Sequence, residues 1–186
     1  RVFAHTAPVF WQRGIANRET GEISSLAAEE CPGSSLIGTL FEIPAEEFPA
    51  FVEREAEFRL QEVDITDLST GGTVQALLCA TNTDEAYKAA QCTRGDKVDA
   101  PCTCVACELL SFGVERVWGG DIRPCRIYTQ FCTRAAEALG PQVHNNFLDQ
   151  TFLADRKTSL RQYLDDHPEV MVEPTPPDLI DRYSEV

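Results

Sequence analysis

Apolar residues follow two different periods in the stretch Leu36–Ile65, the most clearly patterned part of the chain. Its first segment, Leu36–Ile43, is rich in Leu, Ile, Phe and Thr, which predicts a buried strand. Phe48, Phe51 and Val52 then recur at the i, i+3 and i+4 spacing of one helix face. The last segment, which contains Val63 and ends at Ile65, predicts a second strand. The pattern therefore predicts a strand, a helix and a second strand in succession.

The remaining periodic segments predict further elements. A turn at residues 67–72 precedes an apolar strand, Thr73–Thr81, and Thr83 or the residue before it is a candidate helix cap. Apolar residues at helical spacing run from Ile127 to a C-cap at Gly140, and Thr158 is a candidate cap of a later short helix. Strands and helices in this order indicate a compact domain with an antiparallel or mixed sheet.

Two segments lack periodicity. The polar residues 19–35, which include the turn signal Pro32-Gly33, predict a loop before the central strand. Residues 165–186 are rich in proline and acidic side chains, which predicts a tail or an arm laid across a neighbour. If the tail docks, its expected anchors are Leu179, Ile180 and Tyr183.

Glu55 stands where the predicted helix face would continue, at position i+7 from Phe48. Burial penalises the charged form of a carboxyl group, so a buried glutamate raises its pKa or finds a partner. A raised pKa near neutrality suits general acid–base catalysis. In the alternative interpretation, Glu55 lies just past the helix end and pairs with Arg54 or Arg59 at the surface.

The order and spacing of these features resemble the γ-glutamylcyclotransferase-like family. The resemblance covers about residues 1–80, with a looser similarity over 125–164. The opening residues RVFAHTAPVFWQRGIANRE are similar to the family's second segment. Within the central stretch, the similarity is carried by the Val-x-Gly-x-Leu strand opening and by the segment after it, through Gly38, Leu40, Arg54-Glu55, Phe58 and Val63.

This resemblance implies a fold, a reaction and a site. The fold is α+β, with a small mixed or antiparallel, barrel-like sheet flanked by helices. The reaction is of the acyltransferase or lyase type: intramolecular aminolysis of a γ-glutamyl amine, peptide or glutathione to 5-oxoproline and an amine, without a cofactor. Glu55 matches the catalytic acid/base, and Gly38 and Phe58 are further candidates for binding the small γ-glutamyl substrate. The domain would span residues 1–164, with a cysteine-rich insertion at about 92–125.

One departure from the family pattern leaves a second hypothesis open. The family begins with a Tyr-Gly-Ser loop that holds the γ-glutamyl group. No tyrosine of this sequence precedes a glycine, and the sequence starts within what resembles the second segment. The chain is therefore expected to be either an enzyme of this type or a catalytically inactive family member. The inactive form would act as an accessory or structural subunit of a larger assembly, joined through the C-terminal tail.

Cysteines are concentrated in residues 92–125, which hold five of the eight. Cys104 and Cys107, with Cys102 nearby, have the spacing of half a zinc knuckle. The even total also allows disulfides in an oxidising compartment, and free thiols pack as small hydrophobes. The sequence leaves a metal site, disulfides and free thiols as three alternatives. We expect that the protein binds no metal, and the metal site is the weaker alternative.

Composition narrows the class of protein. A chain of 186 residues with 43% hydrophobic residues supports one domain with a real core. A net charge of −14 repels a phosphate backbone, so we expect no nucleic-acid partner. No apolar run approaches the roughly 20 residues of a membrane span. A start at Arg1 is compatible with a cytoplasmic or organellar protein from which an N-terminal segment has been removed, but the compartment stays open.

Overall fold

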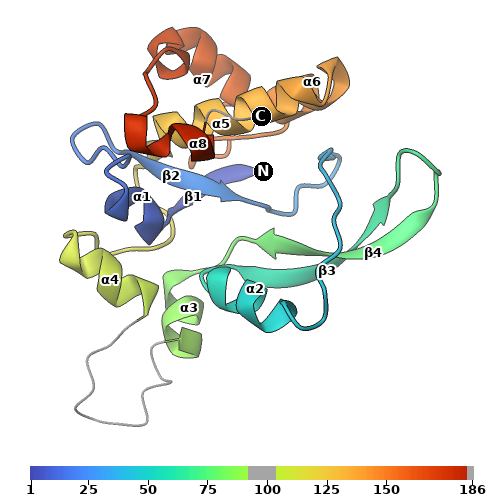
Figure 1. Cartoon of the computed structure of the whole chain (residues 1–186), viewed down its shortest axis with the longest axis horizontal. Helices are drawn as coiled ribbons and strands as arrows, with labels where there is room; N and C mark the ends of the chain where they lie inside the picture. Colours follow the sequence, from blue (N-terminus) through green and yellow to red (C-terminus); the bar gives the residue numbers. More distant parts are fainter. Residues whose placement is uncertain (92–103, 184–186) are drawn as a thin grey trace.

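The computed structural model describes residues 1–91 and 104–183. They form an α+β fold in which helices surround two small sheets (Figure 1). The α+β class predicted from the sequence is therefore confirmed. The expected barrel-like sheet is not found, because the strands of the described residues form sheets of three and two strands that do not close. None of the helices in these two ranges is both long enough and apolar enough to cross a membrane.

Helices make up much of the structure around the sheets. In chain order they are α1 (Pro8–Gln12), α2 (Phe48–Arg54), α3 (Asp84–Gln91), α4 (Val105–Ser111), α5 (Arg126–Ala138), α6 (Pro141–Asp149), α7 (Leu160–Asp166) and α8 (Ile180–Tyr183). Short 3₁₀ turns between α7 and α8 cover Pro168–Met171 and Pro177–Leu179.

Two of the predicted helix ends are confirmed, and one is displaced by a residue. Thr83 Oγ1 accepts a hydrogen bond from the backbone N–H of Ala86 at 3.1 Å, which caps α3. Gly140 follows α5 with a φ of 101°, a conformation that favours glycine. The side chain of Ser159, rather than that of Thr158, caps α7. The hydroxyl of Thr158 instead donates to a carboxylate in the preceding turn.

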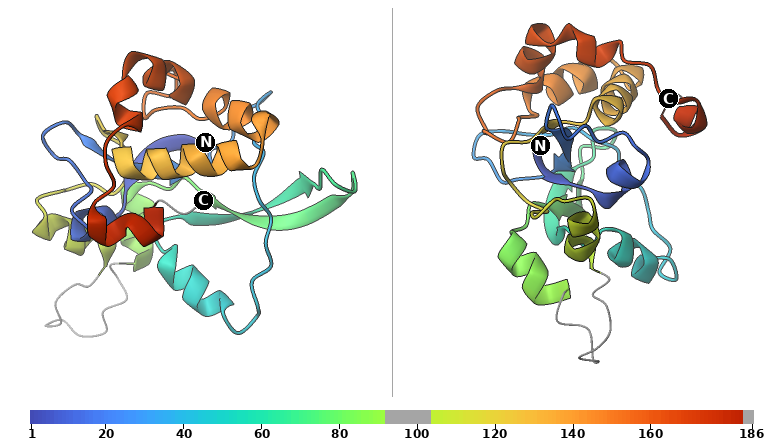
Figure 2. Two further views of the ribbon diagram at one scale, coloured as in Figure 1. Left: turned by 45° about the horizontal axis from the view of Figure 1, so that its top comes forward. Right: turned by 90° about the vertical axis from the view of Figure 1, so that its left-hand side faces the viewer.

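The first sheet has the order β1-β2-β5. Strand β1 (Val2–Thr6) is antiparallel to β2 (Glu22–Ala27), which is parallel to the short β5 (Arg123–Pro124). Alternate residues of β1 face opposite sides of the sheet. Phe3 packs in one cluster with α5, α6 and α7, whereas Val2 and Ala4 pack in another with α3 and α4. The sheet therefore lies between two layers of helices, as Figure 2 shows from two further directions.

Strand β2 corrects the prediction of a loop over residues 19–35. Its polar residues Glu22, Ser24 and Ser25 are buried, so the apolar pattern that marks a strand is absent. The Glu22 carboxylate is 4% exposed and accepts a hydrogen bond from Arg126 Nε of α5 at 2.8 Å. A polar strand is stable here because its charge is neutralised by a helix about a hundred residues later.

The second sheet is the hairpin of β3 (Arg59–Thr66) and β4 (Thr73–Ala80), which projects from the body of the molecule (Figure 1). Both strands and the turn between them are as predicted. The hairpin joins the central sheet at its base, where the N–H of Ala28 donates to Cys79 O at 3.0 Å. The N–H of Thr81 donates in turn to Ala28 O at 2.8 Å.

Residues 36–43 correct a second prediction, because they form no strand. The segment is irregular, and the side chains of Leu40 and Phe41 are 51% and 68% exposed. The backbone N–H of Ile37 donates to Asn146 Oδ1 at 2.8 Å. No described strand pairs with the segment. Its strand-favouring residues therefore have no neighbouring strand with which to form backbone hydrogen bonds. Helix α2 follows as predicted, but none of its residues is buried.

The predicted insertion and tail both contribute to the core. Residues 92–103 lie outside the described residues, whereas 104–125 supply the buried side chains of Leu109, Val117 and Trp118. In the tail, Tyr183 is 5% exposed and its hydroxyl accepts a hydrogen bond from Arg13 Nη1 at 2.9 Å. The C-terminal residues up to 183 therefore pack on the same domain.

We expect Arg126→Ala to lower the free energy of unfolding by about 3 kcal/mol or more, because it leaves the buried Glu22 carboxylate unpaired. Adding Glu22→Gln should restore part of the loss. The control is Arg161→Ala, which removes an exposed pair with Asp149 and should cost about 1 kcal/mol or less. Denaturant unfolding followed by circular dichroism measures all three, and equal small losses for the two arginines would contradict the structural role of the buried pair.

Candidate functional site

Glu55, the predicted catalytic residue, is the C-terminal cap of α2. It therefore lies just past the helix end, as the alternative interpretation supposed, but among the described residues it forms no ion pair with Arg54 or Arg59. The residue is partly buried, and Cys79 Sγ donates a weak hydrogen bond to its Oε2 at 3.9 Å. Burial raises the pKa of the Glu55 carboxyl, and the neighbouring positive charge of Arg54 offsets only part of the rise.

Glu57 is a second carboxyl at this site, and the sequence did not single it out. It is 8% exposed, more deeply buried than Glu55. Burial, together with the nearby charge of Glu55, raises the pKa of Glu57 to about 7. Its backbone carbonyl accepts hydrogen bonds from Trp118 Nε1 at 3.1 Å and from Asn82 Nδ2 at 3.3 Å. Residue 57 lies between the end of α2 and the start of β3. Neither the helical nor the strand spacing of apolar residues applies there, so no sequence pattern marks it.

The pair of carboxyls also affects Cys79 on the adjacent strand. Burial and the charges of Glu55 and Glu57 raise the pKa of the Cys79 thiol to about 12. A thiol with such a pKa is protonated at neutral pH and is a poor nucleophile. The chemistry available at this position is therefore proton transfer by carboxyl groups.

An aromatic cluster supports the same corner of the molecule. The ring of His5 stacks on Trp118 with centroids 4.7 Å apart, and the edge of Phe58 meets His5 at 4.6 Å. Complete burial lowers the pKa of His5 to about 3, so the imidazole is neutral at physiological pH. His5 and Phe58 thus pack in the core next to Glu57.

The other predicted site residues are not assembled around Glu55. Gly38 lies in the exposed irregular segment, and no atom beyond its chain neighbours comes within 4 Å of the place its Cβ would take. Cys102 lies outside the described residues. Cys104 Sγ is 3.6 Å from Cys107 Sγ, and Cys107 is disulfide-bonded, so Cys107 has no thiolate for a metal. Within residues 1–91 and 104–183, no group of three or more His, Cys, Asp or Glu side chains could hold a metal ion.

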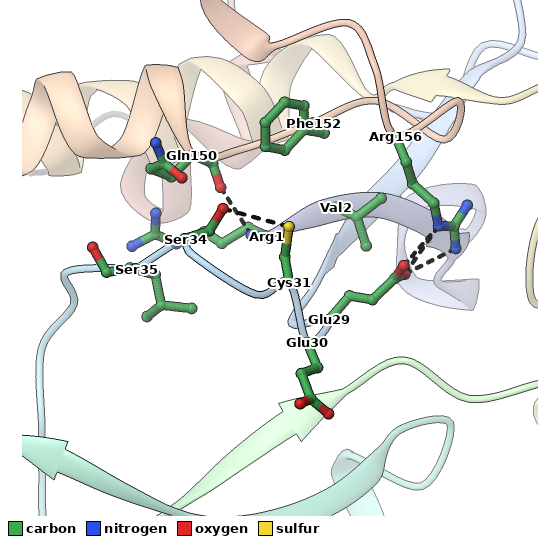
Figure 3. A pocket seen from close by; sticks show the side chains of 11 residues that line it. Arg1, Val2, Glu29, Glu30, Cys31, Ser34, Ser35, Gln150, Phe152 and Arg156 are labelled. Carbon is green, nitrogen blue, oxygen red and sulfur yellow. Dashed lines mark hydrogen bonds and ion pairs between the residues drawn. The ribbon is translucent and has the colours of Figure 1, made fainter.

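Two hollows lie near the central sheet. One of about 170 Å³ is formed where β1 begins, by the loop after β2 and by residues 150–156 (Figure 3). The other, of about 550 Å³, is lined by residues at the start of α3 and by Asn82 and Trp118, which also hold the Glu57 carbonyl. Neither hollow is lined by Glu55 or Glu57.

No protein-family model, curated protein or solved structure matches this chain. The chemical interpretation of the site therefore depends on the sequence pattern and on the geometry of the two carboxyls.

We expect Glu57→Gln to stabilise the protein at neutral pH but not in acid. The folded-state pKa of Glu57 lies above its ordinary value of 4.5, so the stability of the parent falls as the pH rises from about 4.5 to about 7. The rise in pKa corresponds to about 3 kcal/mol of unfolding free energy, which the glutamine variant no longer loses.

Urea unfolding of the parent and the variant at a series of pH values measures the difference between their free energies of unfolding. The titration of all other groups is common to both proteins and cancels in this difference. Glu53→Gln is the control, because Glu53 is exposed on the same helix. A stability difference that does not grow between pH 4.5 and 7.5 would show that the Glu57 carboxyl titrates normally.

Proposed function

We propose that this chain is a γ-glutamylcyclotransferase-like protein that converts a γ-glutamyl amide to 5-oxoproline and an amine. One observation carries the proposal: two neighbouring carboxyls at the end of α2, Glu55 and Glu57, have pKa values raised by burial. The similarity of residues 1–80 to the family, in which Glu55 matches the acid/base, adds to it.

The proposed reaction needs little more than a correctly placed proton carrier. The α-amino nitrogen of the substrate attacks its own γ-carbonyl carbon, a C–N bond forms to close the five-membered ring, and the original amide C–N bond breaks. Ring closure within one molecule supplies the proximity that an enzyme must otherwise provide. A carboxylate accepts the proton released by the attacking amine and returns it to the leaving nitrogen.

Glu55 and Glu57 are assigned different roles because their exposure differs. Glu55 is only partly buried and is open to contact with a substrate, so we assign it the proton transfer. Glu57 is nearly enclosed and, with a pKa of about 7, is half protonated at neutral pH. The charge of Glu55 in turn raises the pKa of Glu57. Glu57 is thus the enclosed neighbour of the proposed acid/base, and we assign it no contact with the substrate.

Release of 5-oxoproline from γ-glutamyl amines, γ-glutamyl peptides and glutathione tests the proposal. We expect Glu55→Gln to lower the rate by about 100-fold or more, the effect of removing a general acid or base. Glu53→Gln, which changes an exposed glutamate of the same helix, should leave the rate unchanged. Equal rates for the parent, Glu55→Gln and Glu55→Ala would remove Glu55 from the mechanism.

A second candidate function, an accessory subunit, is favoured by the surface of residues 36–77. Exposed apolar surface of this kind marks interaction sites. The large apolar side chains exposed along this segment are Leu36, Leu40, Phe41, Phe48, Val52, Leu68, Val74 and Leu77. The segment has nine acidic and two basic residues, so its net charge of −7 is half of the chain's −14. The partner that fits is a protein surface with apolar and basic side chains. Because Tyr183 of the tail is buried against its own domain, we place the contact on residues 36–77 rather than on the tail.

The accessory role predicts a partner held in fixed stoichiometry and released by salt. Phe41→Ser and Leu77→Ser should each weaken the complex by about tenfold or more, since each removes an exposed apolar contact. Leu139→Ser, an exposed leucine at the end of α5, is the control and should have no effect. Affinity purification from the native cells with quantitative mass spectrometry compares them. Equal recovery with all three variants, or recovery unaffected by salt, would exclude this surface as the contact.

A further inference from the structure

The outer edge of β4 carries backbone groups that point away from β3. The two strands pair along the full length of β4 without a bulge, so the direction of the backbone groups alternates regularly along it. The carbonyl of Cys79 and the N–H of Thr81 point outward, because both form hydrogen bonds with Ala28. The alternation therefore places the N–H and C=O groups of Gln75 and Leu77 on the same outer side.

These outward groups are available to another chain. Among residues 1–91 and 104–183, none forms a backbone hydrogen bond with the outer N–H or C=O of Gln75 or Leu77. Both side chains are exposed, and the hairpin extends beyond the helices in Figures 1 and 2. Ala28 forms a parallel bridge to Ala80 at the base of this edge. The edge thus already accepts pairing at its base and is unpaired toward the hairpin turn.

The two strands of the hairpin differ in charge. Strand β3 contains Arg59, Glu62 and Asp64, and charged side chains on an edge strand discourage pairing with another chain. The segment from Leu68 to Thr83, which includes all of β4, has no charged residue and no proline. An exposed edge without such protection is a template for an added strand. The β4 edge is therefore the one at which we expect a further strand to pair.

The two faces of the hairpin determine which side chains an added strand should carry. The pairing of β3 with β4 puts Glu62 opposite Leu77 and Asp64 opposite Gln75, so both carboxylates lie on one face. Successive side chains of an added strand alternate between the two faces. Basic side chains would suit the face that carries the carboxylates, and apolar side chains the other. The residues on that other face are Val63, Ile65, Val74, Ala76 and Leu78.

We propose that the outer edge of β4 binds an extended segment of a partner protein, with alternating basic and apolar residues, as a third strand. Backbone hydrogen bonds to Gln75 and Leu77 supply affinity, and the alternating side chains supply specificity. The net charge of −7 over residues 36–77 favours a basic segment over a second copy of this acidic chain. The inference rests on the accessory role proposed above, for which it names the kind of partner.

Binding of a fluorescein-labelled peptide, KVKVKVK, to the full chain tests the proposal by fluorescence anisotropy. The peptide KKVVVKK has the same composition without the alternation, and EVEVEVE has the alternation with the opposite charge. Each should bind about tenfold or more weakly. Two further peptides carry N-methyl groups on either the lysine or the valine nitrogens, which blocks one edge of the peptide. Only the one whose blocked edge faces β4 should lose binding, by about tenfold or more.

One variant of the edge and its matched control complete the test. Gln75→Pro removes an outward N–H without removing a bond to β3, a position at which an edge strand tolerates proline. It should weaken binding of KVKVKVK by about tenfold or more, whereas Gln75→Thr, which keeps the N–H, should bind like the parent. Circular dichroism checks the fold of both variants. The methylated peptides use the parent chain, so they decide the question even if Gln75→Pro does not fold.

The inference is overturned if KVKVKVK does not bind, if both methylated peptides bind like the unmodified one or lose binding alike, or if folded Gln75→Pro binds like the parent. Sedimentation velocity examines a second copy as the occupant, and a dimer that Gln75→Pro dissociates would also overturn it. Affinity purification from the native cells separates this inference from the accessory role. Equal recovery of a partner by the parent and Gln75→Pro would exclude the added strand but keep the accessory role, whereas recovery of no partner would remove the accessory role itself.

Discussion

The indole of Trp118 holds together the parts of the molecule on which the candidate site depends. One face of its ring stacks on His5 of β1, and its Nε1 donates to the carbonyl of Glu57. Phe58 meets both rings edge-on, which closes the cluster. The start of the β3–β4 hairpin is thereby fixed against the central sheet, and the chain between α2 and β3 is held where its carboxyls are desolvated. Without this contact, the hairpin would be joined to the central sheet mainly by the backbone hydrogen bonds of Ala28.

Two buried glutamates show why a partner decides what a carboxyl does. Glu22 is enclosed by β2 and α5, but Arg126 neutralises it, so it acts as a structural link between sheet and helix. Glu57 is nearly as enclosed and forms no ion pair with any described residue, and its pKa rises to about 7. The first arrangement stabilises the fold at neutral pH, whereas the second sacrifices stability there. Such a loss is typical of groups placed for proton transfer.

The two proposed functions draw on the same part of the chain. The carboxyl pair lies at the junction of α2 with the hairpin, and the exposed Phe48, Val52 and Leu77 belong to these same elements. A partner bound along residues 36–77 would therefore contact the elements that carry Glu55 and Glu57. The acidity of residues 36–77 disfavours self-association through this surface, since two copies would bring like charges together.

Local sequence patterns were enough to predict the elements that periodicity controls. The β3–β4 hairpin, helix α5 with its end at Gly140, and the cap at Thr83 were all predicted, because turn residues, caps and apolar spacing act within a few residues. Long-range contacts explain why polar β2 is a strand, since its Glu22 needs Arg126. They also explain why apolar 36–43 is not a strand, since no strand of the described residues lies beside it. The same holds at the site. Local spacing pointed to Glu55, but Glu57 is more deeply buried, and burial is a property of the assembled core. The backbone carbonyl of Glu57 is held by Trp118, some sixty residues away.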